Sequence, residues 1–418
     1  MFFAASIVLW VGLPAAAQTF LPKVIQFEGA PEYAAQELLN VAELKPGLAL
    51  TQSEMQAHGQ KLMDTGLFDN LTFRFNGGTL TYTLVPSVSL LPVRLQNFPP
   101  AIDKAAEKRL REQIPVYHGK VPAEGGLLNQ VRGALEAMLA AQGITATVSA
   151  APSTGVAPQK GAMGFSIMSP AVEVGEFKLD PAEAAPDAKA MEILAKLSGS
   201  AYDAAGSPDQ IVTYVANYYH DRGYLEAAIH ATAAEVATVT PEAVRIPFLV
   251  SIVPGQQYRL EGVRLAADCL VTQSEFDRQS RIHPGDVAEG QRLLDDWVLV
   301  SHQYHNRGYM AAAVHPVPAF DRARSTVSFS VSVEPGPVYT MGRLIIENGA
   351  DDLRAAMQAA WKMAAGAVFN ESAVDEYFQT QGNTPLGRTF ASANCRYKIT
   401  AHVDTRTVDV TLRLERKP

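Results

Sequence analysis

The chain has 418 residues, of which 47% are hydrophobic and 19% charged, so it is long enough for several folded domains. Its net charge of −8 argues against a nucleic-acid-binding protein, because such proteins usually carry a basic face.

The first seventeen residues are typical of a secretory signal peptide. Phe2 to Leu13 form an apolar stretch of twelve residues, which is too short to cross a bilayer. Ala15, Ala16 and Ala17 then fit a small-residue cleavage site. No Lys or Arg precedes the apolar stretch, and a buried N-terminal helix is the alternative. We expect export, removal of residues 1–17 and a mature chain that begins near Gln18.

The next seventy residues predict a strand, two helices and a hairpin. "KVIQFEG" is a strand, and "PEYAAQELLNVAELKPG" is a helix that ends at Pro46 and Gly47. Thr51 and Glu54 have the spacing of a capping box at the start of the second helix. "LTFRF" and "TLTYTLV" alternate apolar and polar residues, and Asn76-Gly77 supplies the turn between them.

One phrase occurs twice further along the chain. "YYHDRGYLEAAIHA" begins at Tyr218, and "QYHNRGYMAAAVHP" begins 85 residues later at Gln303. A second pair, "FLVSIVPGQQY" and "FSVSVEPGPVY", repeats at a spacing of 81 and reads as a strand followed by a turn. A duplicated phrase indicates a recurring structural joint. We expect Gly223 and Gly308 to let the chain leave a helix in a left-handed conformation.

These patterns divide the chain into five repeats, each with the order strand, helix, helix, strand, strand. Repeats one, three and four carry the strongest patterns. Each has an exit phrase, which is the short motif "TGLF" or "RGY" at which the chain leaves the second helix and enters the hairpin. Repeat two has only Gly143 at this point, and repeat five has "TPLGRTFASANCR" in place of the exit phrase. The predicted repeats one to five span residues 22–89, 90–171, 172–255, 256–336 and 337–418.

The order of these motifs resembles the polypeptide-transport-associated (POTRA) domain of outer-membrane protein assembly factors. The matching residues are the turn Leu44 to Gly47, its counterpart Ile282 to Gly285, and the exit phrases at 65–68, 222–224 and 307–309. The resemblance implies an α+β fold of tandem β-α-α-β-β repeats, each a three-stranded mixed sheet packed against two antiparallel helices. In that family a membrane barrel follows the last repeat, so the sequence is either a stand-alone arm or a fragment that lacks its barrel.

The same residues predict no catalytic site, cofactor or small-molecule substrate. No nucleophile elbow, H-E-x-x-H, P-loop or dinucleotide fingerprint is present. His220 and His230, and likewise His305 and His315, lie ten residues apart with no carboxylate placed consistently in both copies, so no metal site is expected. Cys269 and Cys395 fall in different repeats, which disfavours a disulfide. An enzyme of unknown type is the least favoured alternative.

The structural joints are predicted at five residues of the exit phrases. Tyr219 and Tyr304 should seal the joints by packing, and Arg222 and Arg307 should bind helix-end carbonyls. The joint residues themselves are Gly66, Gly223, Tyr224, Gly308 and Tyr309.

Exposed sheet edges are the predicted partner-binding sites, because their unpaired N–H and C=O groups accept an added strand. Pro316 and Pro318 lack N–H groups along the same edge of their strand, so repeat four should be a poor template for an added strand. Repeats one and three are therefore favoured, at Leu71, Thr72, Phe73, Arg74, Phe75, Ala228, Ile229, His230 and Ala231. The implied partners are unfolded outer-membrane proteins and other assembly components, met in the periplasm at the outer membrane. A structural adapter of the cell envelope that binds no client is the alternative.

Overall fold

The computed structural model describes residues 18–153, 161–179, 188–240, 242–348, 350–381 and 393–416. The predicted signal peptide and most of the segment that replaces the exit phrase in repeat five lie outside the described residues, as does the side chain of Cys395. Cys269 is free. The chain divides into two compact units, Met1–Val212 with His230–Ser251 and Thr213–Ile229 with Ile252–Pro418.

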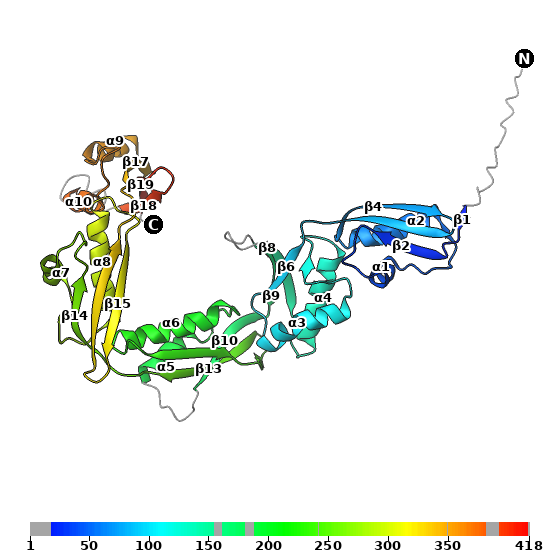
Figure 1. The fold of residues 1–418 in the computed structure, drawn as a ribbon, viewed down its shortest axis with the longest axis horizontal. Coiled ribbons are helices and arrows are strands. Elements are labelled where there is room, and N and C mark those ends of the chain that lie inside the picture. The colour runs from blue at the N-terminus through cyan, green and yellow to red at the C-terminus, as the bar shows by residue number, and fades with distance from the viewer. Residues whose placement is uncertain are drawn as a thin grey trace, which may run out of the picture. The chain divides into compact units, whose positions relative to one another are not determined.

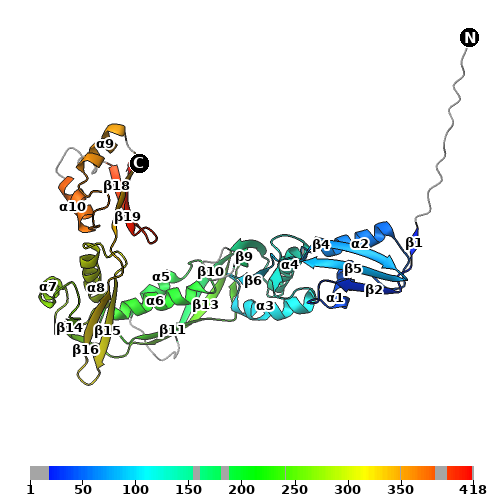
Figure 2. The ribbon, with the colours of Figure 1, turned by 45° about the horizontal axis from the view of Figure 1, so that its top comes forward.

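Repeat one forms a mixed sheet with two helices, as predicted (Figure 1). The sheet order is β2-β5-β4, with β2 parallel and β4 antiparallel to β5. The α2 helix runs alongside β4 in both views (Figures 1 and 2). The elements are β1 (Thr19–Phe20), β2 (Val24–Glu28), α1 (Ala35–Ala42), β3 (Leu50–Thr51), α2 (Gln52–Asp64), β4 (Phe68–Asn76) and β5 (Thr79–Pro86).

Two boundaries in repeat one differ from the prediction. The α1 helix ends at Ala42 instead of Pro46, because Glu43 adopts a left-handed conformation with φ of 52°. The turn of the hairpin is Gly77-Gly78, not Asn76-Gly77, since both glycines have positive φ and Asn76 pairs with Thr79 inside the ladder. The predicted capping box of α2 is confirmed, because the Thr51 side chain accepts from the Glu54 amide and Glu54 accepts from the Thr51 amide.

Repeat two has the sheet order β7-β6-β9-β8, in which a two-residue strand adds to the expected three. Its strand β6 is parallel to β9, and β8 is antiparallel to β9. The elements are β6 (Leu91–Leu95), α3 (Pro100–Gln113), β7 (Lys120–Val121), α4 (Gly126–Ala140), β8 (Thr147–Ser153) and β9 (Ala162–Ser169).

Repeat three has the sheet order β10-β13-β11, with the short β12 also paired to β13. The first strand, β10, is again parallel to the last strand of the hairpin. The elements are β10 (Ala171–Leu179), α5 (Ala188–Leu197), α6 (Gly206–His220), β11 (Ala228–Ala233), β12 (Thr238–Val239) and β13 (Ala243–Val253).

Repeats four and five complete the pattern, with sheet orders β14-β16-β15 and β17-β19-β18. Repeat four contains β14 (Arg259–Leu265), α7 (Gln273–Gln279), α8 (Gly290–His305), β15 (Ala313–Asp321) and β16 (Thr326–Glu334). Repeat five contains β17 (Thr340–Glu347), α9 (Asp351–Ala360), α10 (Ser372–Gln381), β18 (Ala393–His402) and β19 (Thr407–Arg416). The α+β class and the mixed sheets are thus as predicted.

Alternation along the central strand explains the core of repeat four. Val327, Phe329 and Val331 are buried, while the residues between them are more exposed. Because side chains alternate across a strand, these three face the helices, where Val300 and Tyr304 of α8 join the same buried cluster. One face of the sheet is therefore packed against helices, and access to its backbone is limited to its two edges.

Candidate functional site

In repeats two to five, one edge of the sheet is covered by the segment between the two helices. The first strand of each of these repeats pairs with this segment in antiparallel fashion, through Leu91 with Val121, Glu173 with Ala201, Arg259 with Val287, and Thr340 with Val368. In repeat one, β1 and β3 form a separate two-stranded sheet, and the Gly47 amide of this segment donates to the Pro22 carbonyl just before β2. A covered edge offers few free backbone groups to an added strand.

A glycine in this segment fixes it to the first strand. The N–H groups of Gly47, Gly199, Gly285 and Gly366 donate to the carbonyls of Pro22, Val174, Leu260 and Met341 over 2.7 to 2.8 Å. All four glycines have positive φ, between 81° and 94°, which favours glycine. Gly47 and Gly285 lie in turns predicted from the sequence, whereas the roles of Gly199 and Gly366 were not predicted. The constant separation of 25 residues between donor and acceptor is the signal that identifies them.

The opposite edge is open in the part of the chain that the structure describes. This edge is formed by β4, β8, β11, β15 or β18, each of which stands at the end of its sheet order. The predicted binding residues lie on two of these edge strands, β4 and β11. The structure does not bring the two groups together into one site.

The β4 edge presents a regular row of backbone donors. Its two-residue turn has positive φ at both positions, so the flanking pair Asn76 and Thr79 is the hydrogen-bonded type. Hydrogen-bonded and non-hydrogen-bonded pairs then alternate along the ladder. The N–H groups of Leu71, Phe73 and Phe75 therefore point outward, and those of the two residues between them point to β5. The Leu71 N–H donates to Oδ1 of Asn70 over 2.8 Å, so Phe73 and Phe75 carry the outward donors left for an added strand.

The side chains of β4 are distributed between the two faces of the sheet. Those of Leu71, Phe73 and Phe75 are half-buried, and the Phe73 ring lies 5.8 Å from the Tyr82 ring. Thr72 and Arg74 are exposed, and Arg74 forms an ion pair with Glu28 of β2. A segment added to β4 would thus meet aromatic side chains on one face and polar groups on the other.

The β11 edge in repeat three is short and mostly small-sided. Ala228 and His230 are exposed, Ile229 is buried and Ala231 is half-buried. All six residues of the strand retain their amide N–H groups, because none is proline.

The β15 edge in repeat four carries the two prolines. The ladder with β16 runs without a shift through Pro316, opposite Val331, and Pro318, opposite Phe329. Since β15 is an edge strand, the missing N–H groups can face outward without breaking this ladder.

The joint between repeats is built around the predicted exit glycines. Gly223 and Gly308 have φ of 81° and 86°, as expected for the left-handed end of a helix. The amides of Tyr224 and Tyr309 donate back to the carbonyls of Tyr219 and Tyr304 over 3.1 Å in both copies.

Each exit glycine also contacts the next repeat, which the sequence did not indicate. The Gly223 carbonyl accepts from the Tyr258 amide over 2.8 Å, and the Gly308 carbonyl accepts from the Tyr339 amide over the same distance. A Cβ atom on Gly308 would lie 2.9 Å from the Tyr339 oxygen and 2.8 Å from a Val368 methyl group. At the first joint, a Cβ on Gly66 would lie 2.5 Å from the Glu124 oxygen.

The polar residues of the repeated phrase bind the ends of two helices. Arg222 and Arg307 donate to the carbonyls of Tyr218 and Gln303, which confirms the predicted role of both arginines. Asp221 and Asn306 accept from the amides of Gln291 and Ser372, near the start of the second helix in the following repeat. The tyrosines pack as predicted, with Tyr219 and Tyr304 buried and their rings 6.0 and 6.1 Å from those of Tyr224 and Tyr309.

An ionic contact supports the joint between repeats three and four. Arg322, at the tip of the β15-β16 hairpin, forms an ion pair with Glu226, which also accepts from the hydroxyl of the buried Tyr258. The hydrogen bonds from Arg322 and Tyr258 lower the pKa of Glu226 below its usual value.

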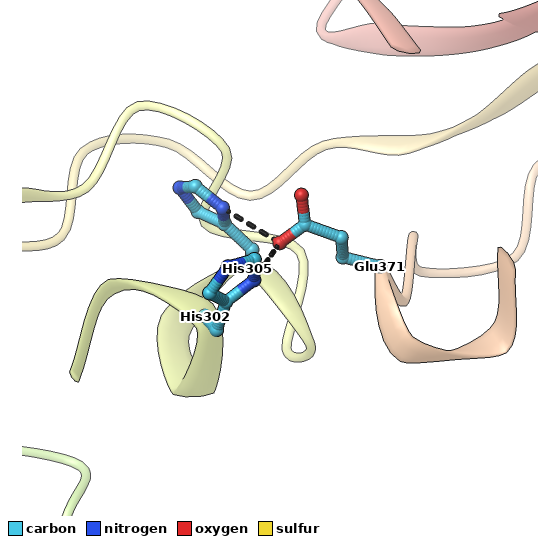
Figure 3. A group of neighbouring side chains, drawn as sticks. All are labelled: His302, His305 and Glu371. Atoms are coloured by element: carbon cyan, nitrogen blue, oxygen red, sulfur yellow. Dashed lines mark hydrogen bonds and ion pairs between the residues drawn. The ribbon is translucent and has the colours of Figure 1, made fainter. Parts of the chain in front are cut away.

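One group of side chains with metal-ligating atoms was not predicted from the sequence. His302, His305 and Glu371 meet at the joint between repeats four and five, within one compact unit (Figure 3). The separation of 66 residues between His305 and Glu371 left no local pattern to detect. Of the four histidines in the repeated phrase, His305 belongs to this group, whereas His220, His230 and His315 do not.

Comparison with known proteins identifies the family that one of the repeats resembles. Residues 258–336 match the POTRA family model, described as a surface antigen variable number repeat, so the chain contains a POTRA domain. A putative outer membrane protein assembly factor of Treponema pallidum (strain Nichols) is 25% identical over 120 residues. That match covers 28% of this chain and spans 14% of the relative's length.

Two solved structures of POTRA domains resemble the chain. POTRA3-5 of BamA from Haemophilus influenzae is 18% identical, with a TM-score of 0.43, over 58% of this chain and 96% of that one. POTRA1-3 of Omp85 from Anabaena is 14% identical, with a TM-score of 0.24, over 59% of this chain and 96% of that one.

Among the described residues, no helix is long and apolar enough to span a membrane.

Proposed function

We propose that this chain is a non-catalytic periplasmic arm that binds extended segments of outer-membrane proteins during their assembly or secretion. The binding occurs by strand addition at the β4 edge of repeat one and the β11 edge of repeat three. Other assembly components are further partners of the same kind.

The observation that carries the proposal is the asymmetry of the sheets. One edge is held by the segment between the helices, and the other ends in a strand that pairs on one side only within the described residues. The β4 strand is nine residues long and contains no proline. Main-chain hydrogen bonds tolerate variation in the added sequence, which suits a receiver of many clients. The POTRA match and the relative named as an assembly factor agree with this role.

Residue-resolved amide exchange tests the proposal, with unfolded outer-membrane peptides added to the whole chain. Strand addition to β4 should slow exchange at Phe73 and Phe75, whose N–H groups point outward. Thr72 and Arg74 are internal controls, because their amides already pair with β5 and should change little. Saturable binding that protects neither β4 nor β11 would refute the proposed site.

A structural adapter that binds no client is the second candidate. It is favoured by the joints, where main-chain hydrogen bonds from Tyr258 and Tyr339 tie consecutive repeats together. Such an adapter would bind one folded envelope protein tightly and leave the β4 amides unprotected when unfolded peptides are added. The exchange experiment therefore separates the two functions.

A further inference from the structure

The last joint brings together three side chains that are suited to a transition metal. His302 and His305 lie three residues apart on the last turns of α8, so they project from the same face of the helix. Glu371 immediately precedes α10 in repeat five. Their ligand atoms all lie within 4.8 Å of one another.

The two imidazoles converge on a single carboxylate oxygen. The Nδ1 atoms of His302 and His305 lie 2.7 and 2.9 Å from Oε2 of Glu371 (Figure 3). Ligands of a tetrahedral zinc ion, bound at 2.0 to 2.1 Å, are about 3.3 Å apart. The two distances from the imidazoles to the carboxylate oxygen thus need to open by about 0.5 Å to admit an ion.

The surroundings suit a metal ligand set. The Nε2 atom of His305 lies 3.3 Å from the Ser301 hydroxyl, a suitable outer partner for an imidazole that binds metal through Nδ1. His302 is half exposed, which leaves a path for the ion and for a water ligand.

The preceding joint shows that the fold does not require these residues. Asn217 and His220 occupy the positions that correspond to His302 and His305, at the spacing of 85. Gly290 corresponds to Glu371 at the spacing of 81, and its Cα faces His220. The equivalent helix contact is nevertheless made at both joints, by Asp221 and Asn306. The His-His-Glu group is therefore an addition to one joint and not a requirement for forming it.

From this geometry we propose that His302, His305 and Glu371 form a binding site for a divalent transition metal of the Zn²⁺ type. The donor set of two imidazoles and one carboxylate is one that zinc accepts, with water in the fourth position. The ion would connect α8 of repeat four to the start of α10 in repeat five. This site is separate from the sheet edges and does not depend on client binding.

Calorimetric titration of Zn²⁺ into the metal-free whole chain tests the site. We expect one ion per chain, with affinity reduced at least tenfold in His302→Asn and in Glu371→Gln. His315→Asn is the matched control, because His315 is an exposed histidine outside the group and its loss should leave the affinity unchanged. Co²⁺ should give the visible absorption of a four-coordinate site in the wild-type chain and lose it in the Glu371 variant.

A stability measurement keeps the test independent of any loss of folding. Zn²⁺ should raise the unfolding midpoint of the wild-type chain, since a ligand that binds only the folded state stabilises it. His302→Asn changes a half-exposed side chain, so it should fold and show no rise. The proposal is overturned if the wild-type chain shows no saturable binding, or if folded His302→Asn and Glu371→Gln proteins bind Zn²⁺ as the wild type does.

Discussion

The carbonyl oxygen of Gly308 accepts a hydrogen bond of 2.8 Å from the amide of Tyr339, the residue just before the first strand of repeat five. Gly223 and Tyr258 are related in the same way, one repeat earlier. Each of these glycines thus ends a helix and also binds the backbone of the next repeat. A side chain at either glycine would clash with backbone atoms of that repeat.

Gly308→Val should destabilise the chain more than Gly143→Val. Both glycines end a helix with positive φ, 86° and 78°, so each substitution costs about 1 to 2 kcal/mol in backbone strain. Only at Gly308 does the new Cβ also meet the Tyr339 oxygen, since nothing lies within 4 Å of the Cβ position at Gly143. Gly223→Val should behave like Gly308→Val. Denaturant unfolding midpoints measure the difference, and equal losses at Gly143 and Gly308 would contradict the role of the joint.

Restoring donors to the edge of repeat four should create a binding strand. The double change Pro316→Thr and Pro318→Thr supplies two outward N–H groups on β15 without altering its register opposite Val331 and Phe329. We expect client binding or self-association through β15, detected by cross-linking from Val317, which is 60% exposed. In the unaltered chain, cross-links should form from β4 and β11 instead. Cross-linking chiefly to unaltered β15 would show that the prolines do not protect this edge.

Acid should weaken the joint between repeats three and four. Hydrogen bonding to Arg322 and Tyr258 holds the pKa of Glu226 below its usual value. Its stabilising contribution is therefore present above the unfolded pKa and lost as the pH falls through the lower folded pKa. The unfolding midpoint of Glu226→Gln should vary less with pH below about 4.3 than that of the wild type. Identical acid profiles for the two proteins would exclude this contribution.

Export should remove the first seventeen residues. The apolar stretch from Phe2 to Leu13 and the three alanines before Gln18 predict cleavage after Ala17. Mass analysis of the periplasmic product should give a mature chain that begins near Gln18. Recovery of a chain that retains Met1 from the cytoplasm would disprove this prediction.

Much of the fold could be predicted from the sequence, because local residue patterns indicate the helices and strands of each repeat. Alternation identified strands such as β16, and the duplicated phrase placed the left-handed exits at Gly223 and Gly308. The end of α1 was predicted wrongly, since Glu43 adopts a left-handed conformation that its residue type does not favour.

The contacts between distant segments could not be predicted from local patterns. The covered sheet edge depends on pairs such as Arg259 with Val287, which form only after the helices fold back. The group at the last joint joins His305 to a glutamate 66 residues later, so neither helix alone reveals it. The β4 donor row needed the turn geometry, because a shift of one turn residue exchanges the inward and outward amides.

The joint formed by an exit glycine and a backbone amide places few demands on side-chain identity. A copied repeat brings both halves of this joint with it, a carbonyl at its exit and an amide before its first strand. Gene duplication could thus lengthen the array without a new interface having to evolve first. Side chains at the joints, such as Gly290 at one and Glu371 at the next, can then diverge while the main-chain hydrogen bond of the joint is kept.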